Sequence, residues 1–453
     1  MDGSCPGGNS RLARITRTSA NHRLLLAPSR TLRAVGTTDE RIVGAENEVQ
    51  MSGVRLILHG QGHSLKRDGG VGRYSHELYK RVQSSRLQNY LPDADVEGWE
   101  FPSGEENAVS NGRPITAKVQ KELKAWAKNW IPPKIVNSAR TALSGESAVR
   151  TSAASIAESN ERIILHEVTN YSSCLEIARL TFQPSLRLCV TFIDLQDLYY
   201  PEYFSDEVLR SRRFHYLFYK ESAHQFFAIS EFTRQTMVER LGIPAERIKV
   251  THLAGDGFQQ PVDHEQNAYA QAFGRYLIYP AKFWKHKNHE FLLKAFSARK
   301  EEFRRQSLQL ILTGGFSPEE SLALHKLAQE HGVDSQVQIL GFQSAAALSA
   351  LVRNALFLVF PSLFEGFGMP ILEALESSCP VICSRQGSLP EVAGDAAIYF
   401  DPLELDSLVG IFDNVLKGSI DRADLVEKGK RQCRKFNWDR TFMDTAEGYA
   451  KLL

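Results

Sequence analysis

Two glutamates, Glu365 and Glu373, lie in the part of this chain whose residue types are best suited to chemistry. Glu365 lies in a glycine-containing loop after the apolar run 355–360, and Glu373 lies one turn into a helix that we expect to begin near Pro370. A glycine loop that leads into a helix presents free backbone N–H groups and the positive end of the helix dipole, which favour a phosphate. Carboxylates repel phosphate but accept hydrogen bonds from sugar or ribose hydroxyls. The segment therefore predicts a nucleotide-sugar site.

A second group of candidate residues follows the apolar run 276–279. Four of its side chains are cationic or can be protonated: Lys282, Lys285, His286 and Lys287. We expect Asn288 to begin a helix, which would place these side chains in a strand-to-helix loop. Lysines in such a loop can neutralise a diphosphate while it is bound and while it leaves. The alternative is a solvated basic loop without a ligand.

A third candidate segment is rich in glycine. The apolar run Val54–Leu58 predicts a strand, and Gly60–Tyr74 follows before a helix that we expect to end near Val82. Its glycines do not have the G-x-G-x-x-G spacing of a dinucleotide site. Because glycine has no Cβ, Gly69 and Gly70 allow peptide N–H groups to approach a ligand closely. A flexible loop is the alternative.

Together these segments resemble the retaining glycosyltransferases of family four (glycosyltransferase group 1). The string E-G-F-G-M-P-I-L-E gives Glu365 and Glu373 the family's spacing, G-G-V-G-R-Y ends at Tyr74, and the lysine loop is similar to the family's G-R-x-x-x-x-K-N. The resemblance implies that Glu365 orients the donor sugar, that Glu373 holds the ribose, and that Lys282 and Lys287 stabilise the departing diphosphate. Lys282 stands where the family has arginine, so the charge is kept but the bidentate fork is lost.

The resemblance implies further donor-binding residues in the same loops. Phe342, in L-G-F-Q, stands where the family places the nucleotide base. The remaining donor-binding positions are Gly69, Gly70, Gly366, Phe367, Gly368, Met369 and Pro370. The sequence has one D-x-D triplet, Asp93-Ala94-Asp95, which lies outside the segments that carry the resemblance, and lysines can neutralise the diphosphate in place of a metal. We therefore expect no metal and no cofactor, with the nucleotide sugar as substrate.

The segment 189–204 is similar to the family's V-T-I-H-D-L. Ile193 stands where the family usually has histidine, and Asp194 is the polar residue that remains. The resemblance therefore places Asp194 with Glu365, Lys282 and Lys287 as a catalytic candidate and carries over no catalytic histidine. His166, at the end of another expected strand, is interpreted as structural or acceptor-side.

The apolar runs alternate with expected helices in two blocks, which predicts an α/β protein. The resemblance implies the GT-B fold, with two doubly wound parallel-sheet (Rossmann-like) domains that face each other across a cleft. The polar stretch 258–274 is interpreted as the interdomain linker. The expected divisions are a disordered, dispensable extension (1–50), an acceptor-side domain (51–260), a donor domain (275–438) and a C-terminal helix that packs back toward the first domain (439–453).

Composition excludes several classes of protein. A net charge of +1 gives no field that would favour nucleic acid. The six cysteines form no C-x-x-C pair, which argues against a zinc site and for reduced thiols in the cytoplasm. No run of 18 apolar residues occurs, so no membrane-spanning helix is expected.

The segment 116–130 has the pattern of an amphipathic helix. Its valine, leucine and tryptophans share one face (Val119, Leu123, Trp126, Trp130), and its lysines share the other (Lys118, Lys121, Lys124, Lys128). The commoner fate of such a helix is to pack its apolar face on its own domain. The second interpretation is peripheral contact with an anionic membrane, which would imply a lipid-linked or membrane-proximal acceptor.

The resemblance implies a retaining transferase that moves mannose or another hexose from a nucleotide-diphosphate donor to a hydroxyl of a saccharide or lipid-linked acceptor. One alternative is a sugar-nucleotide epimerase or hydrolase with the same architecture. Another is a nucleotide-sugar-binding protein that has lost catalysis, which Ile193 favours.

Overall fold

The computed structural model describes residues 54–60, 70–82, 85–91, 94–100, 162–168, 177, 181, 183–255 and 263–453. The predictions for the N-terminal extension, for Gly69 and for the helix 116–130 lie outside these residues.

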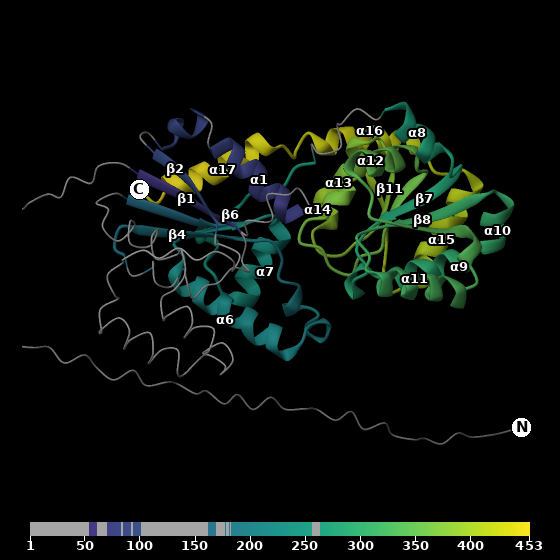
Figure 1. Ribbon diagram of the computed structural model, residues 1–453, viewed down its shortest axis with the longest axis horizontal. Helices are drawn as coiled ribbons and strands as arrows, with labels where there is room; N and C mark the ends of the chain where they lie inside the picture. Colours follow the sequence, from purple (N-terminus) through teal and green to yellow (C-terminus); the bar gives the residue numbers. More distant parts are fainter. Residues whose placement is uncertain are drawn as a thin grey trace, which may run out of the picture. The chain divides into compact units, whose positions relative to one another are not determined.

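The first sheet is parallel and has the strand order β2-β1-β3-β4-β5-β6 (Figure 1). Its strands are β1 (Val54–Gly60), β2 (Ala94–Glu100), β3 (Arg162–Glu167), β4 (Leu186–Phe192), β5 (Gln225–Ala228) and β6 (Ile248–Val250). The inner strands β3, β4 and β5 are mostly buried because such a sheet is covered on both faces, and they are largely apolar runs. Its helices include α1 (Gly70–Val82), α6 (Asp206–Ser222) and α7 (Glu231–Leu241), and its 3₁₀ turns are η2 (Ser85–Asn89), η3 (Gln196–Leu198), η4 (Pro201–Tyr203) and η5 (Ala245–Arg247).

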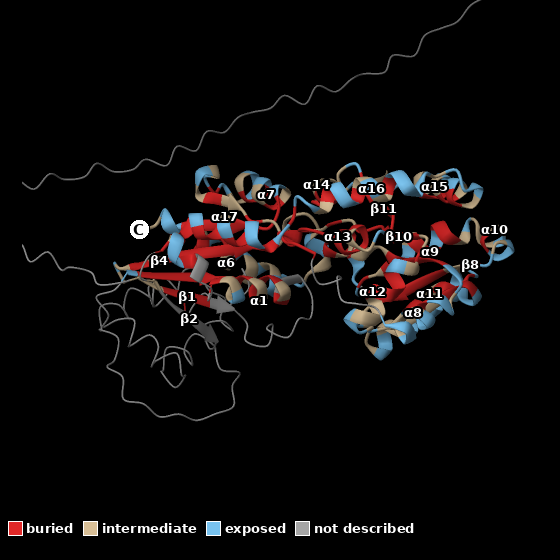
Figure 2. Cartoon of the chain, turned by 90° about the horizontal axis from the view of Figure 1, so that it is seen from above, coloured by how far each residue is buried: buried red, intermediate tan, exposed pale blue. Residues whose placement is uncertain are grey.

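The second sheet is also parallel and has the order β12-β11-β10-β7-β8-β9. Its strands are β7 (Arg275–Pro280), β8 (Leu308–Thr313), β9 (Val337–Gly341), β10 (Phe357–Phe360), β11 (Val381–Ser384) and β12 (Ala397–Phe400). The helical elements between and after them are η7 (Lys285–Lys287), α9 (His289–Ser297), α10 (Lys300–Arg305), α11 (Pro318–Glu330), η8 (Asp334–Gln336), α12 (Ala345–Asn354), α13 (Met369–Glu376), α14 (Leu389–Ala393), α15 (Leu405–Lys417) and α16 (Arg422–Cys433). Figure 2 shows buried residues concentrated on the strands.

The strand order reverses between β1 and β3 in the first sheet and between β7 and β10 in the second. In open α/β sheets, ligands bind beyond the carboxyl ends of the strands at such a reversal. The glycine-rich segment leaves β1, the lysine loop leaves β7, and the loop with Glu365 leaves β10. The topology therefore brings the last two candidate loops to neighbouring strand ends of one sheet.

The stretch expected to be an interdomain linker contains a helix, α8 (His264–Gln271). Asp263 caps its N-terminus in a capping box with Gln266. Tyr269 donates a hydrogen bond to Gln343 (3.3 Å), and the Asn354 amide donates to Asn267 (2.9 Å). Residues 263–271 are therefore not a simple linker. Sequence periodicity gave no signal because most of α8 is exposed and polar.

The C-terminal helix α17 (Trp438–Ala450) packs on the first sheet. The Tyr449 hydroxyl lies 2.6 Å from Nδ1 of His166 on β3, and Lys249 on β6 forms an ion pair with Glu447 (2.9 Å). Gly448 is close to Phe227 of β5, because an added Cβ would lie 2.5 Å from its ring. Figure 1 shows α17 in yellow, and it follows α16 of the second sheet directly in the chain. Within the described ranges, no helix has the length and apolar character needed to cross a membrane.

Candidate functional site

The loop between β10 and α13 carries the first candidate glutamate. Gly368 caps α13 with φ 98°, a conformation that favours glycine. Gly366 approaches the end of β4 so closely that an added Cβ would overlap the Ile193 carbonyl oxygen. We name residues 361–368 the donor loop, since the sequence predicts that it holds the donor. Its glycines are therefore required by the fold of the loop and by close contact with the first sheet.

Glu365 forms an ion pair with Lys287. The distance from Nζ of Lys287 to Oε1 of Glu365 is 2.5 Å, and the side chains are 15% and 11% exposed. Lys287 ends the turn η7, and Asn288 follows with φ 59° and donates from Nδ2 to the Pro361 carbonyl (3.3 Å). The loops after β7 and β10 are thus joined. The pair places a cation beside a carboxylate, a combination that can bind a phosphate next to the hydroxyls of a sugar.

Glu373 is buried in α13 and is paired with Arg73 of α1 (Nη1 to Oε1, 2.6 Å). Burial raises the pKa of Glu373, and the Arg73 guanidinium partly opposes this effect. Arg73 was not among the predicted site residues, although it belongs to the G-G-V-G-R-Y string. The string predicted close approach of its glycines to a ligand, and it gave no signal that its arginine would pair with a glutamate of the second sheet.

The residue after Arg73 anchors the start of α1. The Tyr74 hydroxyl lies 3.0 Å from Oγ1 of Thr191, which also lies 2.8 Å from Nε2 of His166. Burial lowers the pKa of His166 to about 3 and is the main cause that raises the pKa of Tyr74 to about 12. His166 is therefore a neutral residue inside the first sheet, in agreement with the structural interpretation.

Asp194 lies beside the donor loop. Its Cβ is 3.1 Å from where a Cβ on Gly366 would stand. Its carboxylate accepts a hydrogen bond from the Gln196 N–H (3.3 Å) and lies 3.9 Å from Arg212. The backbone carbonyl of Ile193 also lies against Gly366 of the donor loop. This contact does not depend on the side chain, so it does not need the histidine that the family usually has at this position. Asp194, Glu365 and Lys287 therefore gather around one loop.

Lys282 has a different neighbour, the ring of Trp284. Its Nζ lies 5.1 Å from the centre of the Trp284 ring, and it makes no ion pair with any residue that the structure describes. Trp284 is 51% exposed. Of the four residues predicted to converge on one donor, direct contact joins Lys287 and Glu365, and the convergence of Lys282 and Glu373 with them stays a prediction.

The remaining donor-binding candidates differ in exposure. Phe342, at the end of β9, is 73% exposed, so its ring is open to a ligand. Phe367 and Met369 are buried, and Phe367 packs against Phe436 with ring centres 5.7 Å apart. A donor could meet only the backbone of these two residues. Gly70 begins α1, and Pro370 lies in the first turn of α13, where its missing N–H costs nothing.

Residues 268–432 match the family model described as glycosyl transferases group 1. The chain is 30% identical to O-antigen chain mannosyltransferase B of Escherichia coli over 272 residues, which are 59% of this chain and 71% of that protein. It is 29% identical to the serotype-specific mannosyltransferase WbdA of Escherichia coli over 51% of this chain, but spans only 29% of that protein.

Solved structures share the fold. A glycosyltransferase from Rickettsia africae ESF-5 superposes with a TM-score of 0.60 at 16% identity, covering 88% of this chain and 99% of that one. Anabaena Alr3699/HepE in complex with UDP and glucose gives a TM-score of 0.60 at 15% identity, with the same coverage. WaaG, a glycosyltransferase involved in lipopolysaccharide biosynthesis, gives 0.52 at 15% identity, again covering 88% and 99%.

Proposed function

This chain belongs to the group 1 glycosyltransferases of family four, retaining enzymes with the GT-B fold, and we propose that the sugar it transfers is mannose. The donor is a nucleoside-diphosphate sugar, and the acceptor is a hydroxyl of a saccharide or of a lipid-linked saccharide. The observation that carries the proposal is the Lys287–Glu365 pair at the strand reversal of the second sheet. Mannose is chosen because relatives that match this chain are named mannosyltransferases.

The reaction breaks the bond between the sugar and the diphosphate, so negative charge develops on the phosphate oxygens. Lys287 and the N–H groups at the start of α13 would stabilise this charge without reorganisation. Glu365 would accept hydrogen bonds from sugar hydroxyls and hold the sugar beside the ammonium of Lys287. The acceptor would attack on the face that the diphosphate leaves, which retains configuration.

Glu373 would accept hydrogen bonds from the ribose hydroxyls as a carboxylate. Burial opposes ionisation of the Glu373 carboxyl, and the guanidinium of Arg73 favours its ionisation. Arg73 would thus keep Glu373 able to bind ribose. Phe342 offers an exposed ring on which the base could stack.

The first sheet would supply the acceptor side, with Asp194 closest to the donor loop. We retain the division into an acceptor-side and a donor domain as part of the proposal, with α8 assigned to the donor domain by its bonds to Gln343 and Asn354. A cytoplasmic location is proposed because four cysteines (Cys189, Cys379, Cys383, Cys433) are free. Peripheral membrane contact through 116–130 would suit a lipid-linked acceptor.

The test begins with the full chain and a panel of GDP-, UDP- and ADP-sugars. Bound donor raises the melting temperature by mass action, so the panel identifies the nucleotide and sugar. The preferred donor is then incubated with saccharide and lipid-linked acceptors, and the anomeric configuration of the product is read by NMR. A glycoside with the donor's configuration supports the proposal.

Other outcomes contradict it. Release of the free sugar alone identifies a hydrolase, and a changed sugar on the nucleotide identifies an epimerase. Donor binding without turnover with any acceptor identifies a binding protein. Glu365→Gln is the matched control, since loss of the carboxylate should reduce transfer to a low residual rate while the nucleoside diphosphate alone still binds.

A further inference from the structure

The donor loop takes much of its conformation from residues of the first sheet. The Tyr200 hydroxyl donates to the Leu363 carbonyl (3.2 Å), and Oγ of Ser230 donates to the Gly366 carbonyl (2.7 Å). Between these two bonds, the ring of Phe364 packs 5.6 Å from that of Phe232. Backbone groups on both sides of Glu365 are therefore held by side chains that come from other parts of the chain.

Ser230 is the N-cap of α7 and accepts from the Thr233 N–H (3.0 Å). The first N–H groups of a helix have no partner within it. Those of Glu231 and Phe232 donate to the two carboxylate oxygens of Glu391, at 2.8 and 3.2 Å. The negative charge of Glu391 also suits the positive end of the α7 dipole. Glu391 thus binds the helix that binds the donor loop.

Glu391 comes from a segment that holds the donor loop from its other side. The Ser388 N–H and its Oγ both donate to the Glu365 carbonyl, at 3.2 and 3.0 Å. Gly387 has φ 59°, and an added Cβ would lie 2.6 Å from the same carbonyl oxygen. The segment 387–391 therefore touches Glu365 at one end and α7 at the other. His252 lies 2.6 Å from the Glu391 carboxylate and holds it from the side of β6.

We infer that Glu391 is a positioning residue, which fixes Glu365 by linking the N-terminus of α7 to the segment 387–391. This inference rests on the proposed function, in which Glu365 orients the donor sugar. The Glu391 carboxylate bonds to Glu231, Phe232 and His252, and its backbone carbonyl accepts from Gln432. Among the described residues none of these partners is Glu365, so Glu391 acts through the backbone that surrounds Glu365. A shift of the reacting geometry by about 1 Å costs up to about 100-fold in rate. Loss of the link would therefore lower kcat.

The experiment compares Glu391→Ala and Glu391→Gln with the unmodified full chain. Glu391→Ala should lower kcat for sugar transfer by about 10- to 100-fold. Affinity for the nucleoside diphosphate alone should change by less than about twofold, because the nucleotide does not need Glu365. Glu391→Gln keeps an oxygen that can accept one of the two N–H groups, so it should retain an intermediate rate. If Glu391→Ala fails to fold, the kcat of Glu391→Gln provides the test.

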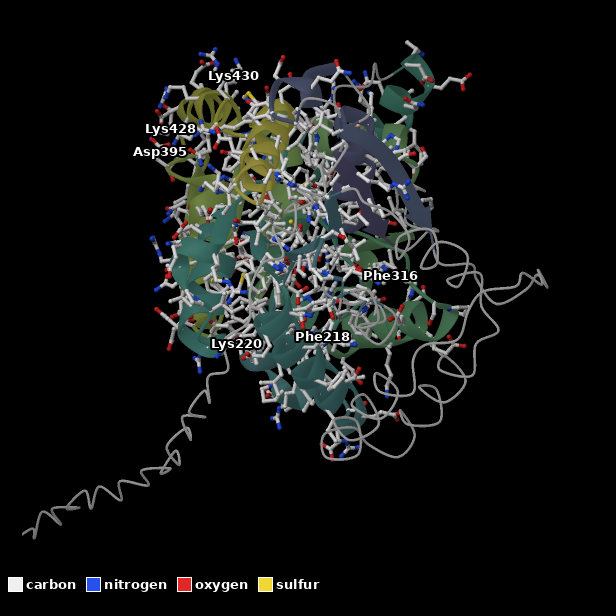
Figure 3. The ribbon with its side chains drawn as sticks, turned by 90° about the vertical axis from the view of Figure 1, so that its left-hand side faces the viewer. Phe218, Lys220, Phe316, Asp395, Lys428 and Lys430 are labelled. Atoms are coloured by element: carbon white, nitrogen blue, oxygen red, sulfur yellow. The ribbon has the colours of Figure 1, made fainter. Side chains whose placement is uncertain are left out.

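Asp421→Ala is the matched control. Asp421 is also a carboxylate at a helix N-terminus and accepts from the Asp424 N–H (3.0 Å) of α16. Figure 3 shows Lys428 and Lys430 of α16 at the periphery of the molecule. Loss of the carboxylate at either helix N-terminus should cost a similar stability, about 1 kcal/mol, which is the usual range for a helix cap. Only Glu391→Ala should lower kcat, and an equal fall in the control would overturn the inference.

A double variant separates positioning from a general loss of structure. If Glu391 acts through Glu365, adding Glu391→Ala to Glu365→Gln should lower the residual rate by less than about twofold. If the two losses multiply, Glu391 does not act through Glu365 and the inference is wrong. An unchanged kcat in folded Glu391→Ala also overturns it. Absence of transfer by the unmodified chain would instead refute the proposed function.

Discussion

In the proposed reaction, negative charge develops beside the ammonium of Lys287, so loss of this group should be costly. We expect Lys287→Ala to lower kcat by about 100-fold or more, the usual effect of removing one group that stabilises developing charge. Lys287→Arg keeps the charge and should lose less. Steady-state kinetics with the preferred donor test this, with melting temperatures to show that both variants fold. A similar small loss in both variants would mean that Lys287 serves only to hold Glu365.

Arg73 should control the pH range in which nucleotide binds. Burial raises the pKa of Glu373, and the Arg73 guanidinium opposes that rise. Arg73→Gln removes the opposition, so the pKa of Glu373 should rise further. In the proposed function, ribose binds to the carboxylate form of Glu373. As pH is lowered, affinity for the nucleoside diphosphate should therefore begin to fall at a higher pH in the variant than in the unmodified chain. Titration calorimetry between pH 5 and 8 tests this, and Arg73→Lys is the control that keeps a charge.

Residue types and spacing predicted Glu365 and Lys287, and the family resemblance predicted Asp194. The structure places all three at the donor loop, each after an apolar run that ends at a sheet edge, and their roles stay predictions. Arg73 could not be assigned in the same way. Its partner, Glu373, is 300 residues away in the sequence, and no local pattern predicts that contact. The doubt over Ile193 has a similar origin, since its contribution to the donor loop is a backbone carbonyl and not a side chain.

The donor loop, as an element, requires a glycine at position 366. An added Cβ would overlap the Ile193 carbonyl, and backbone atoms cannot move aside cheaply. We expect Gly366→Ala to displace Glu365 and lower kcat by more than about 10-fold. Gly410→Ala is the matched control, because Gly410 lies in α15 with nothing within 4 Å of an added Cβ. It should leave kcat unchanged and stabilise the helix by about 0.5–1 kcal/mol.

Element prediction worked best for buried strands. The run 276–279 corresponds to β7 and the run 355–360 to β10, each within two residues at either end. Edge and surface elements were missed for a physical reason. β2 is an edge strand with three acidic residues, and α8 is polar and mostly exposed, so neither has the apolar pattern of a core element.

At the scale of the whole molecule, the chain returns to its first sheet through α17. Trp438, Phe442 and Tyr449 of this helix are all less than 4% exposed, and Tyr449 reaches the buried network of His166 and Thr191. Tyr74 joins the same network from α1. The start of α1, which carries Arg73, is therefore supported by the end of the chain. Packing of α17 therefore connects the last helix to the residue that pairs with Glu373.

That network should make the stability of the protein depend on pH. Burial lowers the pKa of His166 from its ordinary 6.5 to about 3, so the folded state binds fewer protons than the unfolded state between these values. Stability should therefore be fully present above about pH 6.5 and should fall as pH decreases, by up to about 1.4 kcal/mol per pH unit for this residue. His286 and His289 are also buried with pKa values lowered to about 3, so they add to the same slope.

His166→Gln should be less stable at pH 7.5 because its hydrogen bonds are altered. Its stability should nevertheless depend less steeply on pH between pH 6 and 5, by about one proton. Urea unfolding at several pH values tests this, and equal slopes in both proteins would show that His166 does not carry the dependence.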